Sequence, residues 1–397
     1  MSSTTTQIEQ CPVCYKQTFV PFFELNNVPA QDGVLWNNLE EALTAPTGNI
    51  KLAFCQSCGY IGNLLFEPKK IRYDQEYSFS LHFSPTYQNF INDLASRLVE
   101  KYGLKNKRIL EIGCGQGDFL RLICSLGHNR GIGIDPSTTS HVEQIGLHEI
   151  TFLQDFYSEK YARQEVDLVC CRQVLDQLPH PKIFIELLRQ NIGQHAPTTV
   201  YFEVPNAVKI FEDLLIRNII YEKSSWFTPT SISRLFELSG FKILSVEPCF
   251  EGGQYLGIEA VPTSGVVPDQ ITDDADLEYF GQLIRAFSEN YRRKIKTWGE
   301  QLSALRHSGQ RAIVWGAGSG AINFFSMLKI KEEISYVVDI NPQRQGKFLP
   351  LTGQQVVPPE FIQEYKADVI IITNSTYEQE IRQQVADMGM DCRFWVI

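Results

Sequence analysis

The chain has 397 residues, of which 43% are hydrophobic and 21% charged, and its formal net charge is −10 at pH 7. This length accommodates two or three domains, and the composition excludes a fibrous or disordered protein. Nucleic-acid-binding proteins normally carry a basic face, and this acidic chain has no clustered lysine and arginine stretch. A small-molecule substrate is therefore favoured over nucleic acid.

The beginning of the chain, Met1-Ser-Ser-Thr-Thr-Thr, lacks the basic start and apolar stretch of a signal peptide. No apolar run approaches the ~20 residues that a membrane-spanning helix needs. We therefore expect a cytoplasmic protein, without a membrane partner, that is a monomer or a homodimer. In a reducing compartment, the ten cysteines indicate a metal site and core thiols rather than disulfides.

Residues 1–70 consist of short apolar pieces separated by turn residues, which predicts a small β-rich module. Apolar residues at helical spacing predict a helix over 86–102. Strands and helices then alternate to about residue 262, which is typical of a parallel sheet covered by helices. Within it we expect strands at 108–112, 131–135, 166–171 and 199–204, a helix at 119–126, and an antiparallel edge formed by 242–248 and 255–260.

A break rich in proline and turn residues runs from 262 to 269, and a long helix is expected over 273–307. Residues 311–397 predict a second, smaller αβ region with strands at 311–315, 335–339 and 367–372. We therefore divide the chain into 1–70, 71–265 and 266–397.

Two C-x-x-C pairs, Cys11/Cys14 and Cys55/Cys58, predict a metal site in the first part. Two thiolates on one tight turn can face one ion, and a second such turn completes a tetrahedron. Four sulfurs leave no open position, so the expected Zn²⁺ is structural and stabilises a module too small to bury much apolar surface. The alternative is two disulfides or unrelated thiols.

The strand ending at Glu111 is followed by a loop with Gly113, Gly115 and Gly117, which opens a helix. Glycines let the backbone approach a ligand, and the helix N-terminus presents free N–H groups. Asp135 ends the next strand, where a carboxylate can accept hydrogen bonds from ribose hydroxyls. Such a loop also suits a dinucleotide, or is a turn beside a helix-capping aspartate.

Asp155 and Phe156 follow a third short strand, where a carboxylate could meet an adenine amino group and a ring could stack on it. The pattern E-I-G-C-G-x-G followed by G-I-D-P resembles the class I methyltransferases. The resemblance implies that Glu111 and the glycines hold the methionine part of S-adenosylmethionine (SAM), that Asp135 holds the ribose, and that Arg172 lies along the sulfonium side.

Over nearly its full length the chain resembles the sugar C-methyltransferases of deoxysugar biosynthesis, which act on nucleotide-linked keto-sugars. The resemblance rests on the order of parts and on the four cysteines, Tyr77, Glu111 to Gly117, Tyr221 to Phe227, Gly252-Gly253, and Val314 to Gly318. It implies a class I methyltransferase Rossmann-like domain between an N-terminal zinc-binding module and a second, C-terminal Rossmann-like α/β domain that helps to hold the nucleotide-sugar.

The chain departs from this family at two histidines. Lys223 stands where the family has a histidine assigned to proton transfer, and Asp176-Gln177-Leu178-Pro179 lacks the histidine that precedes Ile-Pro. The family's base is thus missing, although Glu222 remains.

Carbon methylation beside a ketone requires a base for the α-proton and a group that stabilises the enolate. The catalytic candidates are Tyr77, Glu222, Lys223 and His82. A neighbouring carboxylate opposes deprotonation of a lysine, so we expect Lys223 to stabilise charge; the alternative is an ordinary surface lysine. His82 is either a base or a structural residue, and Asp176 and Gln177 lie where they could face substrate.

In the C-terminal region, Gly316-Ala-Gly318-Ser-Gly320 with Asp339 is interpreted as a fold device or a diphosphate contact rather than a nicotinamide site. The leading hypothesis is SAM-dependent C-methylation of a nucleotide-linked sugar. The alternatives are O- or N-methylation of another small metabolite and a non-catalytic protein that binds SAM or a nucleotide-sugar.

Overall fold

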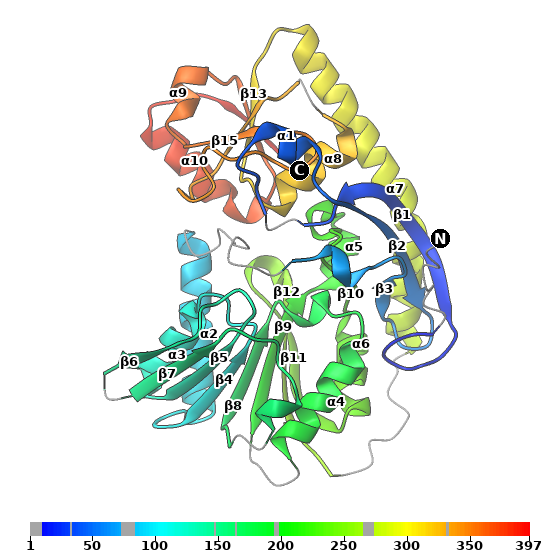
Figure 1. The fold of residues 1–397 in the computed structure, drawn as a ribbon. Coiled ribbons are helices and arrows are strands. Elements are labelled where there is room, and N and C mark those ends of the chain that lie inside the picture. Colours follow the sequence, from blue (N-terminus) through cyan, green and yellow to red (C-terminus); the bar gives the residue numbers. More distant parts are fainter. Residues whose placement is uncertain are drawn as a thin grey trace.

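Figure 1 shows the fold in a computed structural model of the protein. The structure describes residues 10–31, 34–72, 84–146, 148–162, 165–193, 198–264, 274–330 and 333–397. They form three sheets, of eight, four and five strands.

The eight-stranded sheet has the order β11-β12-β9-β8-β4-β5-β7-β6. Its strands are β4 (Arg108–Ile112), β5 (Arg130–Ile134), β6 (His141–Ile145), β7 (His148–Leu153), β8 (Leu168–Arg172), β9 (Thr199–Pro205), β11 (Phe241–Cys249) and β12 (Tyr255–Pro262). The five central strands β9, β8, β4, β5 and β7 are parallel, and both edges are antiparallel. Parallel strands must be buried on both faces, which explains their continuous apolar character.

Helices cover both faces of this sheet. They are α2 (Pro85–Lys101), α3 (Asp118–Gly127), α4 (Pro181–Ile192) and α6 (Pro229–Leu238). The short helix α5 (Ala207–Glu212) packs instead in the apolar cluster that contains Phe23 and Phe287. The apolar stripes of α2 and α3 pack with Ile109 on one face, and those of α4 and α6 pack with Leu110 and Ile112 on the other. Alternation along β4 therefore puts Glu111 on the face that α2 and α3 cover.

The four-stranded sheet has the order β1-β2-β3-β10. Its strands are β1 (Phe19–Pro29), β2 (Thr47–Cys55), β3 (Ile61–Asn63) and β10 (Ser225–Trp226), and a short helix, α1 (Leu39–Leu43), precedes β2. The fourth strand comes from far along the chain, because Ser225 pairs with Gly62 and Trp226 with Ile61. The N-terminal sheet is thus completed by the segment that directly follows Glu222 and Lys223.

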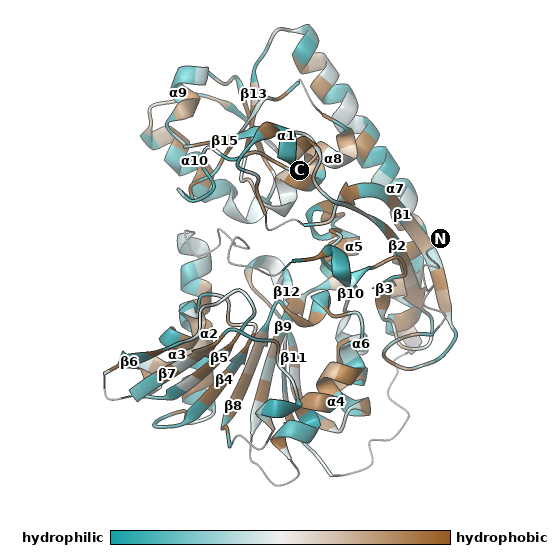
Figure 2. Ribbon diagram, viewed as in Figure 1, coloured by the Kyte–Doolittle hydropathy of each residue, from teal (hydrophilic) through white to brown (hydrophobic). Residues whose placement is uncertain are grey.

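The five-stranded sheet is entirely parallel and has the order β15-β14-β13-β16-β17. Its elements are β13 (Ala312–Trp315), α8 (Ser319–Leu328), β14 (Tyr336–Val338), β15 (Gln355–Val357), α9 (Phe361–Tyr365), β16 (Val369–Ile372), α10 (Glu378–Asp387) and β17 (Arg393–Val396). In Figure 2, strands of the five-stranded and eight-stranded sheets are largely brown (hydrophobic), and the helices around them carry teal (hydrophilic) residues.

The long helix α7 (Asp274–His307) runs along β1 and β2 and leads to the five-stranded sheet (Figure 1). Phe287 is 1% exposed and makes edge-to-face contacts with Phe22, Phe23 and Phe211. These contacts bury the apolar side of a helix whose other residues are largely charged. Within the described part of the chain, no helix combines the length and the apolar character needed to cross a bilayer.

The elements expected from the sequence are confirmed, with ends that differ by one or two residues. The strands that the sequence did not predict include β15 and β17 in the C-terminal unit, and β6 and β10 elsewhere. β6 carries a polar, mostly exposed sequence, and β10 has only two residues, so neither has a recognisable period of its own.

We expect Phe287→Ala to lower the free energy of unfolding by about 3–5 kcal/mol, because it leaves a cavity between α7, β1 and α5. Leu244→Ala, at a side chain that is 45% exposed, should cost far less. Urea denaturation of both variants tests the docking of α7, and equal losses would contradict it.

Candidate active site and cysteine cluster

The loop after β4 is shaped by three glycines with positive φ, Gly113 at 72°, Gly115 at 53° and Gly117 at 84°. A Cβ at Gly113 would lie 2.1 Å from Val174 Cγ2, and one at Gly117 would lie 2.2 Å from Phe152 Cε1. At Gly115 such an atom would meet nothing within 4 Å among the described residues. Two glycines are thus required by packing, and the third leaves the loop open to a ligand.

Asp135 is fixed beside this loop. Its carboxylate accepts hydrogen bonds from Gly115 N at 2.9 Å, from Ser137 N at 2.7 Å and from Ser137 Oγ at 2.6 Å. Its carbonyl oxygen accepts from Asp155 N at 3.2 Å, which joins the ends of β5 and β7. The structure therefore brings the predicted glycines, Asp135 and Asp155 together at one edge of the sheet.

The side chains of Asp155 and Phe156 behave differently. The Asp155 carboxylate accepts from Tyr161 Oη at 2.6 Å and from Phe156 N at 2.8 Å, and it pairs with Lys160. The Phe156 side chain is 63% exposed. Its free ring is available to stack on a planar ligand, whereas Asp155 already has protein partners.

Three charged side chains lie in a row on the α2–α3 face of the sheet: Glu111 on β4, Arg172 on β8 and Glu203 on β9. Arg172 and Glu203 are register partners, with Nη2 3.4 Å from Oε1. The Arg172 guanidinium also donates to Tyr87 Oη at 2.9 Å and lies 4.4 Å from the centre of the Phe119 ring. Arg172 is thereby locked beside the glycine loop.

Two buried atoms in this row lack a hydrogen bond among the described residues, Glu111 Oε2 and Arg172 Nε. Buried polar atoms normally have partners, so an unmet acceptor and an unmet donor next to an open loop suggest a missing ligand. The amino-acid end of SAM carries an ammonium and a carboxylate, and these groups match the two atoms. The residues present therefore fit this cofactor.

Glu203 was missed from the sequence, although a signal was present. It is the one charged residue of β9, Thr199-Val-Tyr-Phe-Glu-Val-Pro205, and it is fully buried. A charge inside a buried strand is costly unless it is paired, so such a residue predicts a buried partner.

Lys223, one of the catalytic candidates, forms an ion pair: its Nζ lies 2.8 Å from Asp176 Oδ2. Lys223 is 9% exposed and Asp176 2% exposed, so the alternative of an ordinary surface lysine is wrong. Asp176 lies in the short 3₁₀ turn Leu175–Gln177 after β8, close to Val174, which contacts Gly113. The contact between Val174 and Gly113 therefore places the ion pair next to the glycine loop after β4. Glu222, beside Lys223 in the chain, is 1% exposed.

Tyr77 and His82, the other two catalytic candidates, lie outside the described residues. Their positions relative to Lys223 stay predictions from the sequence.

The N-terminal sheet holds the segment around Lys223 from both sides. The ring of Tyr221 fills a notch at Gly48, where a Cβ would lie 2.2 Å from Cε2, and its hydroxyl accepts from Glu67 N at 2.8 Å. On the other side, Tyr60 Oη and Ser225 Oγ are 2.6 Å apart, and Ser225 Oγ donates to the carbonyl of Leu178 at 3.1 Å.

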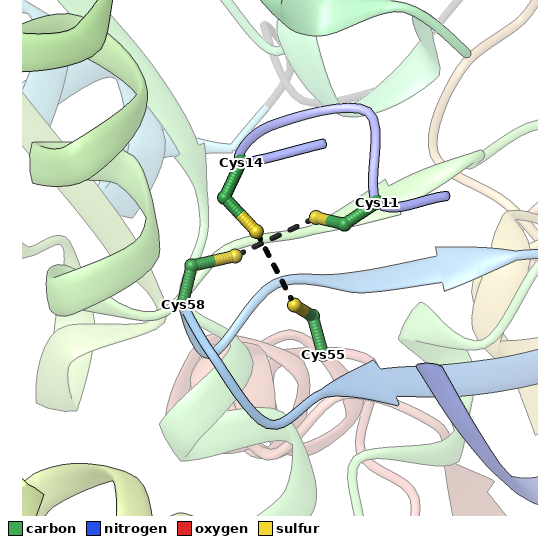
Figure 3. A group of neighbouring side chains, drawn as sticks. All are labelled: Cys11, Cys14, Cys55 and Cys58. Atoms are coloured by element: carbon green, nitrogen blue, oxygen red, sulfur yellow. Dashed lines mark hydrogen bonds between the residues drawn. The ribbon is translucent and has the colours of Figure 1, made fainter. Parts of the chain in front are cut away.

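Cys11, Cys14, Cys55 and Cys58 converge at the end of this sheet (Figure 3). Their four sulfur atoms lie within 4.8 Å of one another. The Cys11–Cys58 and Cys14–Cys55 sulfurs are 3.5 and 3.6 Å apart, well beyond a disulfide bond, so the two-disulfide alternative is wrong. A hydrogen bond with Cys11 is the main cause that lowers the pKa of Cys14 to about 7, and a hydrogen bond between Cys55 and Cys11 is the main cause that lowers the pKa of Cys55. The cluster can hold a metal ion.

The C-terminal glycine loop repeats the Asp135 arrangement with one difference. Asp339 accepts from Ala317 N at 2.9 Å and from Asn341 N at 2.8 Å. Here a buried arginine, Arg344, lies 3.8 Å from Asp339 Oδ2 and donates to the carbonyl of Ala317 at 3.0 Å. The Asp339 carboxylate therefore lies beside the Arg344 guanidinium.

Residues 85–246 match the family model described as a methyltransferase domain, and residues 308–393 match a model described as C2185-like, N-terminal. A curated relative, the C-methyltransferase NovU of Streptomyces niveus, is 21% identical over 96% of this chain and 93% of its own.

Two solved structures are similar to part of the chain. Magnesium protoporphyrin IX methyltransferase from Synechocystis PCC 6803, with S-adenosylhomocysteine (SAH) bound, is 15% identical and covers 45% of this chain and 84% of its own, with a TM-score of 0.35. A SAM-dependent methyltransferase from Aquifex aeolicus is 16% identical and covers 49% and 98%, with a TM-score of 0.33. TM-scores of this size establish no common fold for the whole chain. The methyltransferase-domain match makes the protein a SAM-dependent methyltransferase.

Burial raises the pKa of Glu111 from 4.5 to about 8. The folded protein therefore keeps a proton that the unfolded chain releases above pH 4.5, and stability falls as pH rises from there to about 8. Glu111→Gln removes this dependence, so the variant should gain stability over wild type by up to roughly 1.4 kcal/mol per pH unit in that window.

Urea unfolding at several pH values measures this difference, and Glu149→Gln at an exposed site on β7 is the control. Parallel pH curves for wild type and Glu111→Gln would contradict a protonated Glu111.

Proposed function

We propose that this SAM-dependent methyltransferase transfers a methyl group to a carbon atom of a nucleotide-linked keto-sugar. The observation that carries the proposal is the full-length likeness to a C-methyltransferase, over 96% of the chain. The likeness extends beyond the methyltransferase domain to the cysteine-rich and C-terminal parts, which a generic methyltransferase does not need. The resemblance to the sugar C-methyltransferases supplies the substrate class.

In this proposal, Glu111 and Arg172 hold the amino-acid end of SAM, and the backbone around Gly113, Gly115 and Gly117 lies along it. Asp135 accepts hydrogen bonds from the ribose hydroxyls, and the exposed Phe156 ring stacks on the adenine, with Asp155 beside it. When bound, SAM supplies an electrophilic methyl group, so the chain's own task is positioning and proton removal.

Lys223 is the group that stabilises the enolate oxygen. Its ammonium is buried and held by Asp176, so it needs little reorganisation to meet a developing negative charge. Glu222 lies next to it in the chain and is 1% exposed. Tyr77 stays a catalytic candidate from the sequence, and His82 stays either a base or a structural residue.

The C-terminal unit is proposed to be the second Rossmann-like domain and to hold the nucleotide-sugar. Its strand order runs outward from β13 to β14 and β15 on one side and to β16 and β17 on the other, as in doubly wound sheets. The cation beside Asp339 supports a contact with a diphosphate rather than with the ribose of a nicotinamide cofactor.

For the cysteine cluster we propose a structural Zn²⁺. Four thiols that converge without a disulfide suit tetrahedral zinc, and a cation would favour their ionised forms. The ion would stabilise the four-stranded sheet and, through β10, the segment that carries Lys223.

The alternative reaction, O- or N-methylation, is supported by the loss of both family histidines, replaced by Gln177 and Lys223. Deuterium exchange separates the two reactions. With SAH bound, wild-type protein in D₂O should exchange the α-hydrogen of a nucleoside-diphosphate-linked keto-deoxyhexose, because enolisation precedes carbon methylation. Mass spectrometry of the sugar reports the exchange.

A methylated product without α-exchange would favour O- or N-methylation. If a broad panel of keto-sugars showed neither exchange nor methylation although SAH binds, the proposed substrate class would be wrong.

Cys58→Ser should abolish stoichiometric zinc binding and lower the free energy of unfolding by on the order of several kcal/mol, because the metal-bound state is lost. Cys392→Ser, at a buried thiol of the C-terminal unit, should retain zinc. Elemental analysis with thermal unfolding measures both effects, and equal zinc contents in the two variants would contradict the assignment.

A further inference from the structure

The Asp176 carboxylate has two oxygens in different environments. Oδ2 accepts from Lys223 Nζ at 2.8 Å, whereas Oδ1 is buried and has no hydrogen bond within the described chain. Burying a carboxylate oxygen without a hydrogen-bond partner costs free energy, so such an oxygen calls for a partner. A proton of a bound substrate would be such a partner, present only in the complex.

The position of Asp176 fits this explanation. The turn Leu175–Gln177 follows β8 at the edge of the sheet where the cofactor loop lies, and Val174 contacts Gly113. The backbone carbonyl of Asp176 accepts from Ser224 N at 2.9 Å, which ties the turn to the Lys223 segment. The Lys223 side chain keeps 11% of its surface exposed, so the pair has one open edge.

We infer that Asp176 is the general base of the reaction and that Lys223 is its electrophilic partner; this inference rests on the proposed carbon methylation. Asp176 Oδ1 removes the α-proton of the keto-sugar while Lys223 Nζ donates a hydrogen bond to the ketone oxygen. One buried ammonium–carboxylate pair thus supplies both groups that enolisation requires.

In this step, the α-carbon–hydrogen bond of the sugar breaks and an O–H bond forms at Oδ1 of Asp176. The electron pair of the broken bond forms the carbon–carbon double bond of the enolate, and the carbonyl π-electrons move to the oxygen beside Lys223. The proton on Asp176 later returns to solvent, which restores the carboxylate.

Lys223 itself is unsuited to the base role. Its ammonium donates to Asp176, and a protonated amine has no lone pair with which to take a proton. Glu222 is the competing carboxylate, because it is 1% exposed and adjacent to Lys223 in the chain. The two carboxylates can be separated by substitution.

The test is α-hydrogen exchange of a nucleoside-diphosphate-linked keto-deoxyhexose in D₂O, with SAH bound. Asp176→Asn keeps an oxygen for Lys223 and removes the base, so exchange should fall at least about 100-fold. Calorimetry should give SAH affinity within about twofold of wild type, because Asp176 is not a proposed cofactor ligand. Lys223→Met should also lower exchange strongly.

Asp213→Asn is the matched control, because Asp213 pairs with Lys209 at 2.7 Å on the surface, away from the turn. It should exchange at the wild-type rate. Wild-type exchange in Asp176→Asn, or its loss in Glu222→Gln but not in Asp176→Asn, would overturn the inference and leave the proposed function intact. Absence of exchange in wild type would instead count against the proposed function.

Asp176→Glu covers the case in which Asp176→Asn fails to fold, since breaking a buried ion pair can destabilise a protein strongly. The longer side chain can keep the pair with Lys223 and shifts the carboxylate. A folded Asp176→Glu variant that binds SAH should exchange at least about tenfold more slowly if Asp176 is the base. Full wild-type exchange in that variant would indicate a purely structural ion pair.

Discussion

The pairing of β3 with β10 is the contact on which the position of Lys223, and with it the proposed active site, depends. It joins the four-stranded N-terminal sheet to Ser225 and Trp226, which follow Lys223 closely in the chain. The hydrogen bond between Tyr60 and Ser225 and the Tyr221 ring in the Gly48 notch secure the same segment at both ends. The N-terminal part therefore supports Lys223, a residue of the proposed active site, as well as forming a separate sheet. The Zn²⁺ proposed for the cysteine cluster would influence the position of Lys223 through this support.

Several charged side chains are buried near the glycine loop. One face of the sheet carries Glu111, Arg172 and Glu203 at its carboxyl edge. The turn beside it carries Asp176, which pairs with Lys223 from the segment before β10. Such burial is costly, and several of these groups retain unmet hydrogen-bonding atoms. A ligand that carries both charges, followed by an acceptor that develops an anion, would use this preorganised environment. The unpaired polar atoms would thus find their hydrogen-bond partners when the ligands bind.

The two glycine loops show how one backbone arrangement serves different ends. Asp135 and Asp339 each accept a hydrogen bond from the loop before them and from the amide two residues later. Asp339 also has a buried arginine, Arg344, beside it. In the proposed function, the cation beside Asp339 suits this turn to a diphosphate, whereas the turn at Asp135 suits a ribose.

The sequence determined the elements whose signals are local. The glycine spacing after Glu111, the apolar strands and the paired C-x-x-C turns predicted the glycine loop, the parallel sheets and the cysteine cluster, because turn geometry and period depend on neighbours in the chain. Only the tertiary structure decided that β10 completes a distant sheet, that Glu203 pairs with Arg172 and that Lys223 is buried against Asp176. These contacts join residues that are 31 to 165 positions apart, as for Arg172–Glu203 and Tyr60–Ser225, and no local period encodes them. Their partners are selected when buried charges and unpaired backbone groups must be satisfied in the packed interior.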